Sequence, residues 1–142
     1  MTDALYNARI LELAGNISHI GRLDAPQATA EATSRMCGSH VRVELSLDES
    51  GCVSDFAHEV EACALGQATS AVMAREIVGS TPEDLRLVGA AMRAMLKADG
   101  APPDGRWRDL ALLRPVRDYP PRHASTLLTF DAVEDCLKQL GA

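Results

Sequence analysis

The sequence predicts an α+β fold in which a small antiparallel three-stranded sheet is packed on one side by helices. Two patterns lead to this prediction. Apolar and polar residues alternate on both sides of a turn within residues 37–63, which is typical of a β-hairpin, and apolar residues recur at helical spacing before and after it. We expect a short edge strand near residues 32–36 to complete the sheet. The 142 residues are 46% hydrophobic, enough for one core, so a single domain over residues 1–142 is expected.

The hairpin is the best-defined part of the prediction. Its first strand places apolar residues on one face and polar residues on the other, and a turn at residues 48–51 leads to a second strand that ends at Cys63. Antiparallel strands bring the two open ends of a hairpin together. We therefore expect the thiols of Cys37 and Cys63 to converge on one edge. The inward residues of the first strand are Val41, Val43, Leu45 and Leu47, and the outward ones are His40, Arg42, Glu44 and Ser46.

Helices are expected on both sides of the hairpin. A helix that follows Cys63 is rich in small residues such as Gly66, which would let its backbone approach the sheet closely. Ser80 and Thr81, followed by a proline and an acid, signal the start of another helix. A first helix is expected over residues 5–17, capped by Thr2 or Asp3, and the helix after Cys63 should end at Gly79. Chain breaks are expected at 100–105 and 114–121, with a short element at 107–113 between them. A final helix should run from Ser125 onward.

The charge of the chain narrows the classes of partner. A formal net charge of -6 leaves no basic stripe, so nucleic acid and anionic membrane are not expected as partners, and a small ion or another protein fits better. The sequence has neither an apolar run of bilayer length nor the basic-then-apolar order of a signal peptide, so we expect a cytoplasmic protein. Thiols stay reduced in that compartment, which favours ligands, nucleophiles or core residues over disulfides.

The cysteines and histidines leave several chemistries open. Cys63 precedes a helix, and a helix N-terminus favours the thiolate, which is a ready metal ligand. A second interpretation makes Cys63 or Cys37 a nucleophile with His123 or His40 as the base. A third treats both cysteines as structural residues, which is the interpretation we prefer for the other two cysteines of the chain, at positions 52 and 136. His58 lies on the apolar side of its strand and is expected to be a hydrogen-bonded core residue.

Motifs spread over nearly the whole chain resemble those of the IscU/SufU/NifU N-terminal family of iron-sulfur cluster assembly scaffolds, most closely its SufU branch. The likeness implies a SufE/NifU-like fold and extends to an insertion before Ser125 that separates SufU from IscU. The motifs are Met36-Cys37-Gly38-Ser39, then Ala62-Cys63 before a small-residue helix, and Tyr119-Pro120-Pro121-Arg122-His123-Ala124-Ser125.

The resemblance implies a metal site with a degenerate ligand set. In the family, three cysteines and one aspartate hold zinc or a nascent cluster. Cys37 and Cys63 match two of the cysteines, whereas Ser39 stands at the aspartate position and Ser125 at the third cysteine position. Serine is a poor ligand for these metals because its hydroxyl is not ionised near neutral pH.

The functional expectation is therefore a scaffold-like protein, not an enzyme, that binds iron, an iron-sulfur cluster or zinc through Cys37 and Cys63. A second protomer would supply the missing thiolates in a homodimer, or His123 or His40 would complete a weaker site. The family implies a cysteine desulfurase as partner. The alternative is a module that binds no cluster and acts as a sulfur acceptor or regulator docked to a desulfurase.

Overall fold

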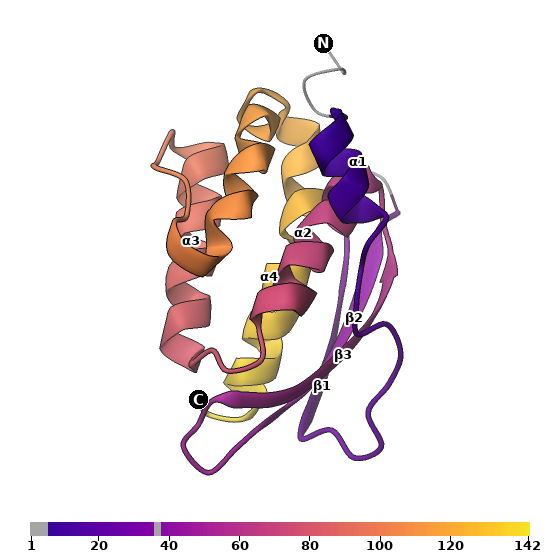
Figure 1. Cartoon of the computed structure of the whole chain (residues 1–142), viewed down its shortest axis with the longest axis vertical. Helices are drawn as coiled ribbons and strands as arrows, with labels where there is room; N and C mark the ends of the chain where they lie inside the picture. Colours follow the sequence, from indigo (N-terminus) through magenta and orange to yellow (C-terminus); the bar gives the residue numbers. More distant parts are fainter. Residues whose placement is uncertain (1–5, 36–37) are drawn as a thin grey trace.

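Three antiparallel strands in the order β1-β2-β3 form one layer of the fold, and the helices cover one face of this sheet (Figure 1). The strands are β1 (Ala28–Thr33), β2 (His40–Leu47) and β3 (Val53–Glu61). The computed structural model describes residues 6–35 and 38–142. The predicted α+β class, with a three-stranded sheet packed on one side, is confirmed.

The predicted hairpin is present between β2 and β3. Val43 pairs with His58 and Leu45 with Phe56, and the register shifts at Ser46/Leu47 next to the turn. The Asp48 carboxylate closes the turn by accepting hydrogen bonds from the backbone of Ser50 and Cys52. Because this turn extends to Cys52, the cysteine precedes β3, which begins at Val53.

The edge strand lies earlier than the sequence pattern indicated. β1 begins at Ala28 and ends at Thr33, whereas the prediction placed the strand near residues 32–36. The pairing with β2 decides this position, since Ala28 lies opposite Leu45 and Ala30 opposite Val43, and both alanines are buried. Pairing with residues 40–45 of β2, together with the burial of these alanines, thus extends the strand into a segment with low β propensity.

Helices fill the space beside the sheet. α4 packs directly on β1 and β2, α2 lies between α1 and α4, and α3 packs against α4 and η2 on the side away from the sheet (Figure 1). The helical elements are α1 (Ala8–Ala14), α2 (Ala64–Glu76), α3 (Pro82–Lys97), the 3-10 helices η2 (Gly105–Asp118) and η3 (Pro120–Arg122), and α4 (His123–Gln139).

The ends of the helices match the sequence signals unevenly. At α3 the predicted start is confirmed: the Thr81 hydroxyl accepts a hydrogen bond from the Asp84 N–H at 3.0 Å, and the Asp84 carboxylate accepts one from the Thr81 N–H at 3.2 Å. α2 ends at Glu76, before the Gly79 that the sequence suggested. α1 is capped by the Asn7 side chain, not by Thr2 or Asp3, and these two residues lie outside the described part of the chain.

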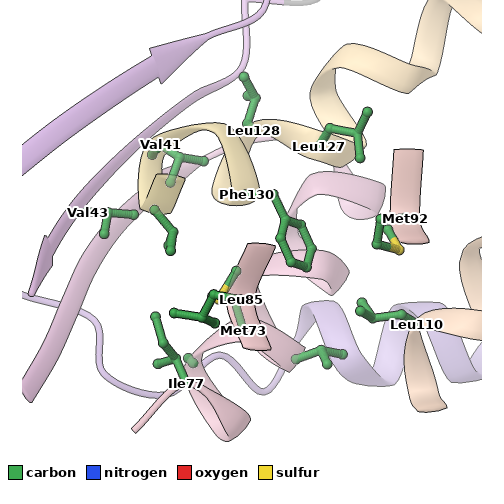
Figure 2. Close-up of a cluster of buried hydrophobic side chains, with 14 of the residues drawn as sticks. Val41, Val43, Met73, Ile77, Leu85, Met92, Leu110, Leu127, Leu128 and Phe130 are labelled. Carbon is green, nitrogen blue, oxygen red and sulfur yellow. The ribbon is translucent and has the colours of Figure 1, made fainter. Parts of the chain in front are cut away.

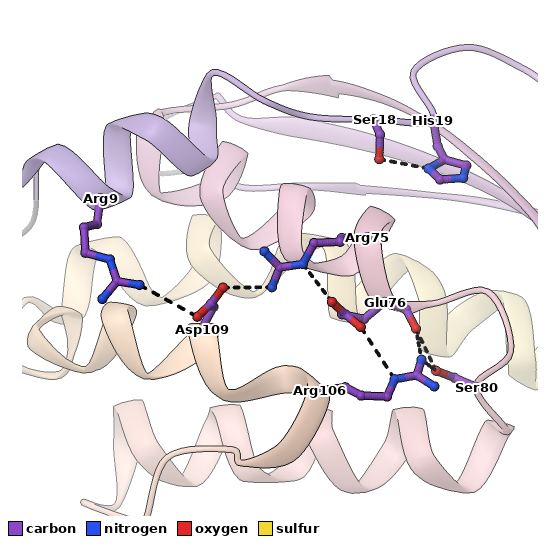
Figure 3. A network of polar contacts seen from close by, with 8 residues as sticks. All are labelled: Arg9, Ser18, His19, Arg75, Glu76, Ser80, Arg106 and Asp109. Atoms are coloured by element: carbon purple, nitrogen blue, oxygen red, sulfur yellow. Dashed lines mark hydrogen bonds and ion pairs between the residues drawn. The ribbon is translucent and has the colours of Figure 1, made fainter.

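The predicted break over residues 114–121 is wrong for most of its length. η2 continues through Pro115 to Asp118. Leu113 and Val116 on this segment are buried, and their packing outweighs the backbone hydrogen bond that proline cannot donate. An ion-pair network also ties η2 to α2: Arg75 contacts Asp109 at 2.9 Å, and Arg106 donates to the backbone carbonyl of Glu76 (Figure 3).

The core lies between the sheet and the helices, with Phe130 of α4 near its centre (Figure 2). Met92 and Met95 are fully buried and serve as core residues. Cys136 is also fully buried, with its Sγ 3.7 Å from the Val43 carbonyl. This burial confirms the expectation of a structural residue, and it raises the pKa of the thiol to about 12.

The outer face of the sheet is less solvated than its polar residues suggested. Glu44 is only 3% exposed, and its carboxylate accepts a hydrogen bond from the Leu23 N–H at 2.7 Å and pairs with Arg42. Burial alone would raise the pKa of Glu44, but the Leu23 N–H and the Arg42 guanidinium stabilise the anion and leave the pKa below its ordinary value. Within the described residues, no helix combines the length and the apolar character needed to span a bilayer.

Candidate functional site

Cys63 lies at the junction between β3 and α2. It is the N-cap residue of α2, with extended backbone angles of φ -66° and ψ 170°, and its side chain makes no capping hydrogen bond to the first turn. The half-buried sulfur instead faces the first turn of α4, where Cys63 Sγ lies 3.6 Å from Ser125 Oγ. Two residues that are 62 positions apart in the sequence therefore meet, as the sequence prediction required.

Ser125 is fully buried in the first turn of α4. Its hydroxyl donates to the Arg122 carbonyl at 3.2 Å, and the Thr126 hydroxyl donates to the same carbonyl at 2.8 Å. The Arg122 carbonyl thus keeps a donor when the Ser125 hydroxyl turns toward the Cys63 sulfur. Sequence reasoning missed Thr126, because nothing in a Ser-Thr pair shows that both hydroxyls share one acceptor.

A glycine makes the contact between the two helices possible. A Cβ atom at Gly66 would lie 2.9 Å from the Ser125 carbonyl oxygen and 2.9 Å from Ala62 Cβ. The small residue was expected to bring α2 close to the sheet, but at this position it brings α2 close to α4. This correction matters for the site, since the approach of α2 to Ser125 carries Cys63 with it.

Ser39 is the third predicted site residue that the structure brings to this place. It is 3% exposed, and its Oγ accepts a long hydrogen bond of 3.4 Å from the Cys63 backbone N–H. The preceding Gly38 has φ +69°, a conformation that favours glycine, and its N–H donates to the Ser34 carbonyl. Cys37 lies outside the described residues, so its predicted place beside Cys63 stays a prediction.

The candidate bases form their hydrogen bonds with groups other than the described thiol. His123 Nε2 lies 3.0 Å from the Val116 carbonyl, and His40 is held by Thr33 and Glu31. In the described part of the chain, neither imidazole is hydrogen-bonded to Cys63, so the arrangement offers no Cys-His pair there.

His58 is a core histidine, as predicted. It is 1% exposed, its Nε2–H donates to the Ser18 carbonyl at 2.8 Å, and its ring lies 4.8 Å from that of Phe56. Burial lowers the pKa of the imidazole, so the ring is neutral at physiological pH.

The donor set can be compared with a tetrahedral metal centre. Zn–S bonds of about 2.3 Å place neighbouring ligands about 3.8 Å apart. The Cys63 Sγ to Ser125 Oγ distance of 3.6 Å is close to this spacing, but a neutral hydroxyl is not a thiolate. Among residues 6–35 and 38–142, no group of three or more His, Cys, Asp or Glu residues is placed to hold a metal ion.

Fold and site together define an α+β domain with a thiol site at the junction of its sheet and helices. The NifU-like N-terminal domain family model matches residues 5–103, and the chain belongs to this family of iron-sulfur cluster assembly scaffolds. The crystal structure of a NifU-like protein (N-terminal) from Brucella abortus is 55% identical, with a TM-score of 0.95 over 98% of this chain and 96% of that one. The resemblance inferred from the motifs is confirmed.

Two more distant relatives agree with this assignment. The iron-sulfur cluster assembly scaffold protein IscU of Streptococcus pyogenes serotype M1 is 22% identical over 95% of this chain and 84% of that protein. A putative iron-sulfur cluster assembly scaffold protein for the SUF system from Fervidobacterium islandicum AW-1 is 20% identical, with a TM-score of 0.87 over 96% of this chain and 99% of that one. The latter likeness shows a shared fold.

Proposed function

We propose that this protein carries iron or a nascent iron-sulfur cluster on the thiolates of Cys37 and Cys63, and that the remaining ligands come from a second protomer. The observation that supports this most directly is the convergence of Ser39, Cys63 and Ser125. Two of these positions hold serine, so one chain offers two thiolates at most. Two chains together offer four, which suits a small cluster or a tetrahedral zinc ion.

The family supports a sulfur source for this assembly. In our proposal, a cysteine desulfurase docks at the Cys63 end of the sheet and delivers sulfur as a persulfide. The role is that of a carrier and not of an enzyme, and zinc competes with iron for the same thiolates.

Anaerobic reconstitution with iron and sulfide tests the proposal. We expect a visible chromophore in the wild type and its loss in both Cys37→Ala and Cys63→Ala, because each removes half of the thiolates of one chain. Cys52→Ala is the matched control: this half-buried cysteine precedes β3 at the end opposite Cys63 and should leave the chromophore unchanged. If the wild type shows no chromophore after reconstitution and also holds no zinc, metal binding is refuted.

The contact between Cys63 and Ser125 supports a second candidate function, that of a sulfur acceptor without a cluster. A Cys63 thiolate attacks the terminal sulfur of a desulfurase persulfide, a new S–S bond forms on Cys63, and the enzyme leaves as a thiolate. When the new persulfide has given its proton to the departing enzyme thiolate, the Ser125 hydroxyl would donate to the resulting anion on Cys63, while Thr126 continues to satisfy the Arg122 carbonyl.

Mass spectrometry after incubation with a desulfurase and cysteine separates the two candidates. A gain of one sulfur atom on Cys63, with no chromophore after reconstitution, would favour the acceptor. In that case Ser125→Ala should shorten the lifetime of the persulfide, whereas Ser70→Ala, which removes another buried hydroxyl of the same core, should not. Unmodified cysteines and no complex with the desulfurase would exclude the acceptor role.

A further inference from the structure

A groove lies between α3 and the beginning of η2, away from the thiol site. One wall is the face of α3 that carries Asp84, Leu87 and Ala91, and the other wall contains Asp104 and Trp107. Its volume is about 350 Å³, which is within the range of pockets that take a ligand or an anchoring side chain. We call it the α3–η2 groove.

The groove has an apolar floor and an exposed apolar rim. The Trp107 side chain is 6% exposed and packs against Phe130, with ring centroids 6.4 Å apart, so the floor is fixed to the core. Leu87 is 62% exposed, the most exposed large apolar side chain of the described residues. A single exposed leucine is ordinary, but one beside an indole floor forms an anchoring site for another apolar side chain.

The charges around this apolar centre are mainly negative. The Asp104 carboxylate makes no hydrogen bond or ion pair with any residue that the structure describes, although it lies in the wall of the groove. Asp84 is exposed and is bonded through its carboxylate to the Thr81 N–H. The one cation of the lining, Arg106, is already engaged by Glu76 and Ser80 (Figure 3). The Asp104 carboxylate therefore remains to face an incoming group, and Asp84 adds a second negative charge to the lining.

We propose that the α3–η2 groove docks a segment of a partner protein in which a large apolar side chain is flanked by lysine or arginine. The apolar side chain lies between Leu87 and Trp107, and the flanking cations face Asp84 and Asp104. α3 lies on the side of α4 remote from the sheet, so the segment binds without occupying Cys63 (Figure 1). The inference is independent of the metal-binding proposal.

Trp107 gives the experiment a built-in reporter because it is the only tryptophan of the chain. The probe is a short peptide with one leucine between pairs of lysines, titrated into the full chain while indole fluorescence is followed. We expect saturable binding that weakens with added salt. A peptide with alanine in place of leucine and one with glutamate in place of lysine should both bind at least about tenfold more weakly.

Two variants place the binding in the groove. Leu87→Ser should weaken it about tenfold, and Asp104→Asn about threefold, since a partly exposed charge contributes less than a buried apolar contact. Leu11→Ser, a substitution of a 51% exposed leucine on α1, is the matched control and should have no effect. Cys63→Ser should leave peptide binding unchanged, because the groove does not depend on the thiol site or on bound metal.

Three results would overturn the inference. The first is no binding of the lysine-flanked peptide at millimolar concentration. The second is an equal loss of affinity in Leu11→Ser and Leu87→Ser. The third is tighter binding of the glutamate-flanked peptide, which would mean that the Arg106 guanidinium and not the carboxylates selects the partner.

Discussion

Ser125 is the residue whose chemistry most limits the site. It is fully buried, it lies 3.6 Å from the Cys63 sulfur, and its neutral hydroxyl has a hydrogen-bond acceptor of its own. The geometry of a ligand position is therefore present without the ligand chemistry. A single substitution can test whether the hydroxyl is what limits metal binding.

Ser125→Cys should increase zinc retention. A thiolate would replace a hydroxyl at a distance from Cys63 that suits a tetrahedral ion, so we expect affinity to rise by on the order of tenfold or more. Competition with a chromogenic chelator measures this directly. Ser70→Cys makes the same change at another fully buried serine, two turns along α2, and an equal rise there would show that position 125 is not special.

His58 should make stability depend on pH. Its folded pKa lies below the ordinary 6.5, so in the window just below pH 6.5 the unfolded chain binds a proton that the folded chain does not. The contribution of His58 to the free energy of unfolding is fully present above pH 6.5 and declines as the pH falls toward the folded pKa. The loss is about 1.4 kcal/mol for each unit between the unfolded and the folded pKa.

Urea unfolding between pH 8 and pH 5.5 measures this dependence. His58→Leu should lower the free energy of unfolding overall, since the Ser18 carbonyl loses its donor, but should flatten its pH dependence. His40→Gln, a change at a more exposed histidine, should retain the wild-type slope. A steep slope that persists in His58→Leu would assign the effect to other groups.

At the scale of elements, the site depends on how closely α2 approaches α4. The two helices begin beside each other, Cys63 at the start of one and Ser125 in the first turn of the other, and Gly66 lies between them. α4 in turn is held against β1 and β2 by its apolar face. The sheet thus positions Ser125 through α4, and Cys63 through β3.

Gly66→Ala should destabilise the fold, in contrast to the usual effect of this substitution in a helix. The added Cβ would lie 2.9 Å from backbone and side-chain atoms, so we expect a loss of about 1–3 kcal/mol from overpacking. Gly15→Ala is the control: its Cβ would meet nothing closer than 3.4 Å and its φ is -84°, so it should be neutral or stabilising by up to about 1 kcal/mol. Chemical unfolding of both variants provides the comparison.

On the scale of the whole molecule, sequence and structure agree best where local pattern and tertiary packing favour the same element. The alternation around Val43 predicted the hairpin, and the Thr81-Pro82 signal predicted the start of α3. The continuation of η2 beyond residue 113 and the start of β1 were missed because burial of Val116 and Ala28, which no local pattern encodes, decides them. Of the site, the meeting of positions 63 and 125 followed from the motifs, whereas its dependence on Gly66 needed the packing of α2 on α4.

The whole molecule also provides a test of ligand sharing. If two chains complete one site, zinc- or cluster-loaded protein should sediment as a dimer and the metal-free protein as a monomer. Cys63→Ala should remain monomeric with metal present. Ser125→Cys should form less dimer when it binds zinc, since it supplies a third thiolate in the same chain. The net charge of -6 on each chain opposes association, so the dimer should be favoured by salt. A monomeric, fully loaded wild type would contradict the shared site.

The position of Cys136 has a practical consequence. Its sulfur is sealed beneath α4, against β2, and with a pKa of about 12 it stays protonated and inert toward alkylating reagents while the native packing holds. The alkylation rate of this one sulfur therefore measures how fast the interior opens. The cysteines that react faster in the same sample report whether metal is bound. A single quenched time course of alkylation would thus measure the opening rate of the fold and the occupancy of the metal site together.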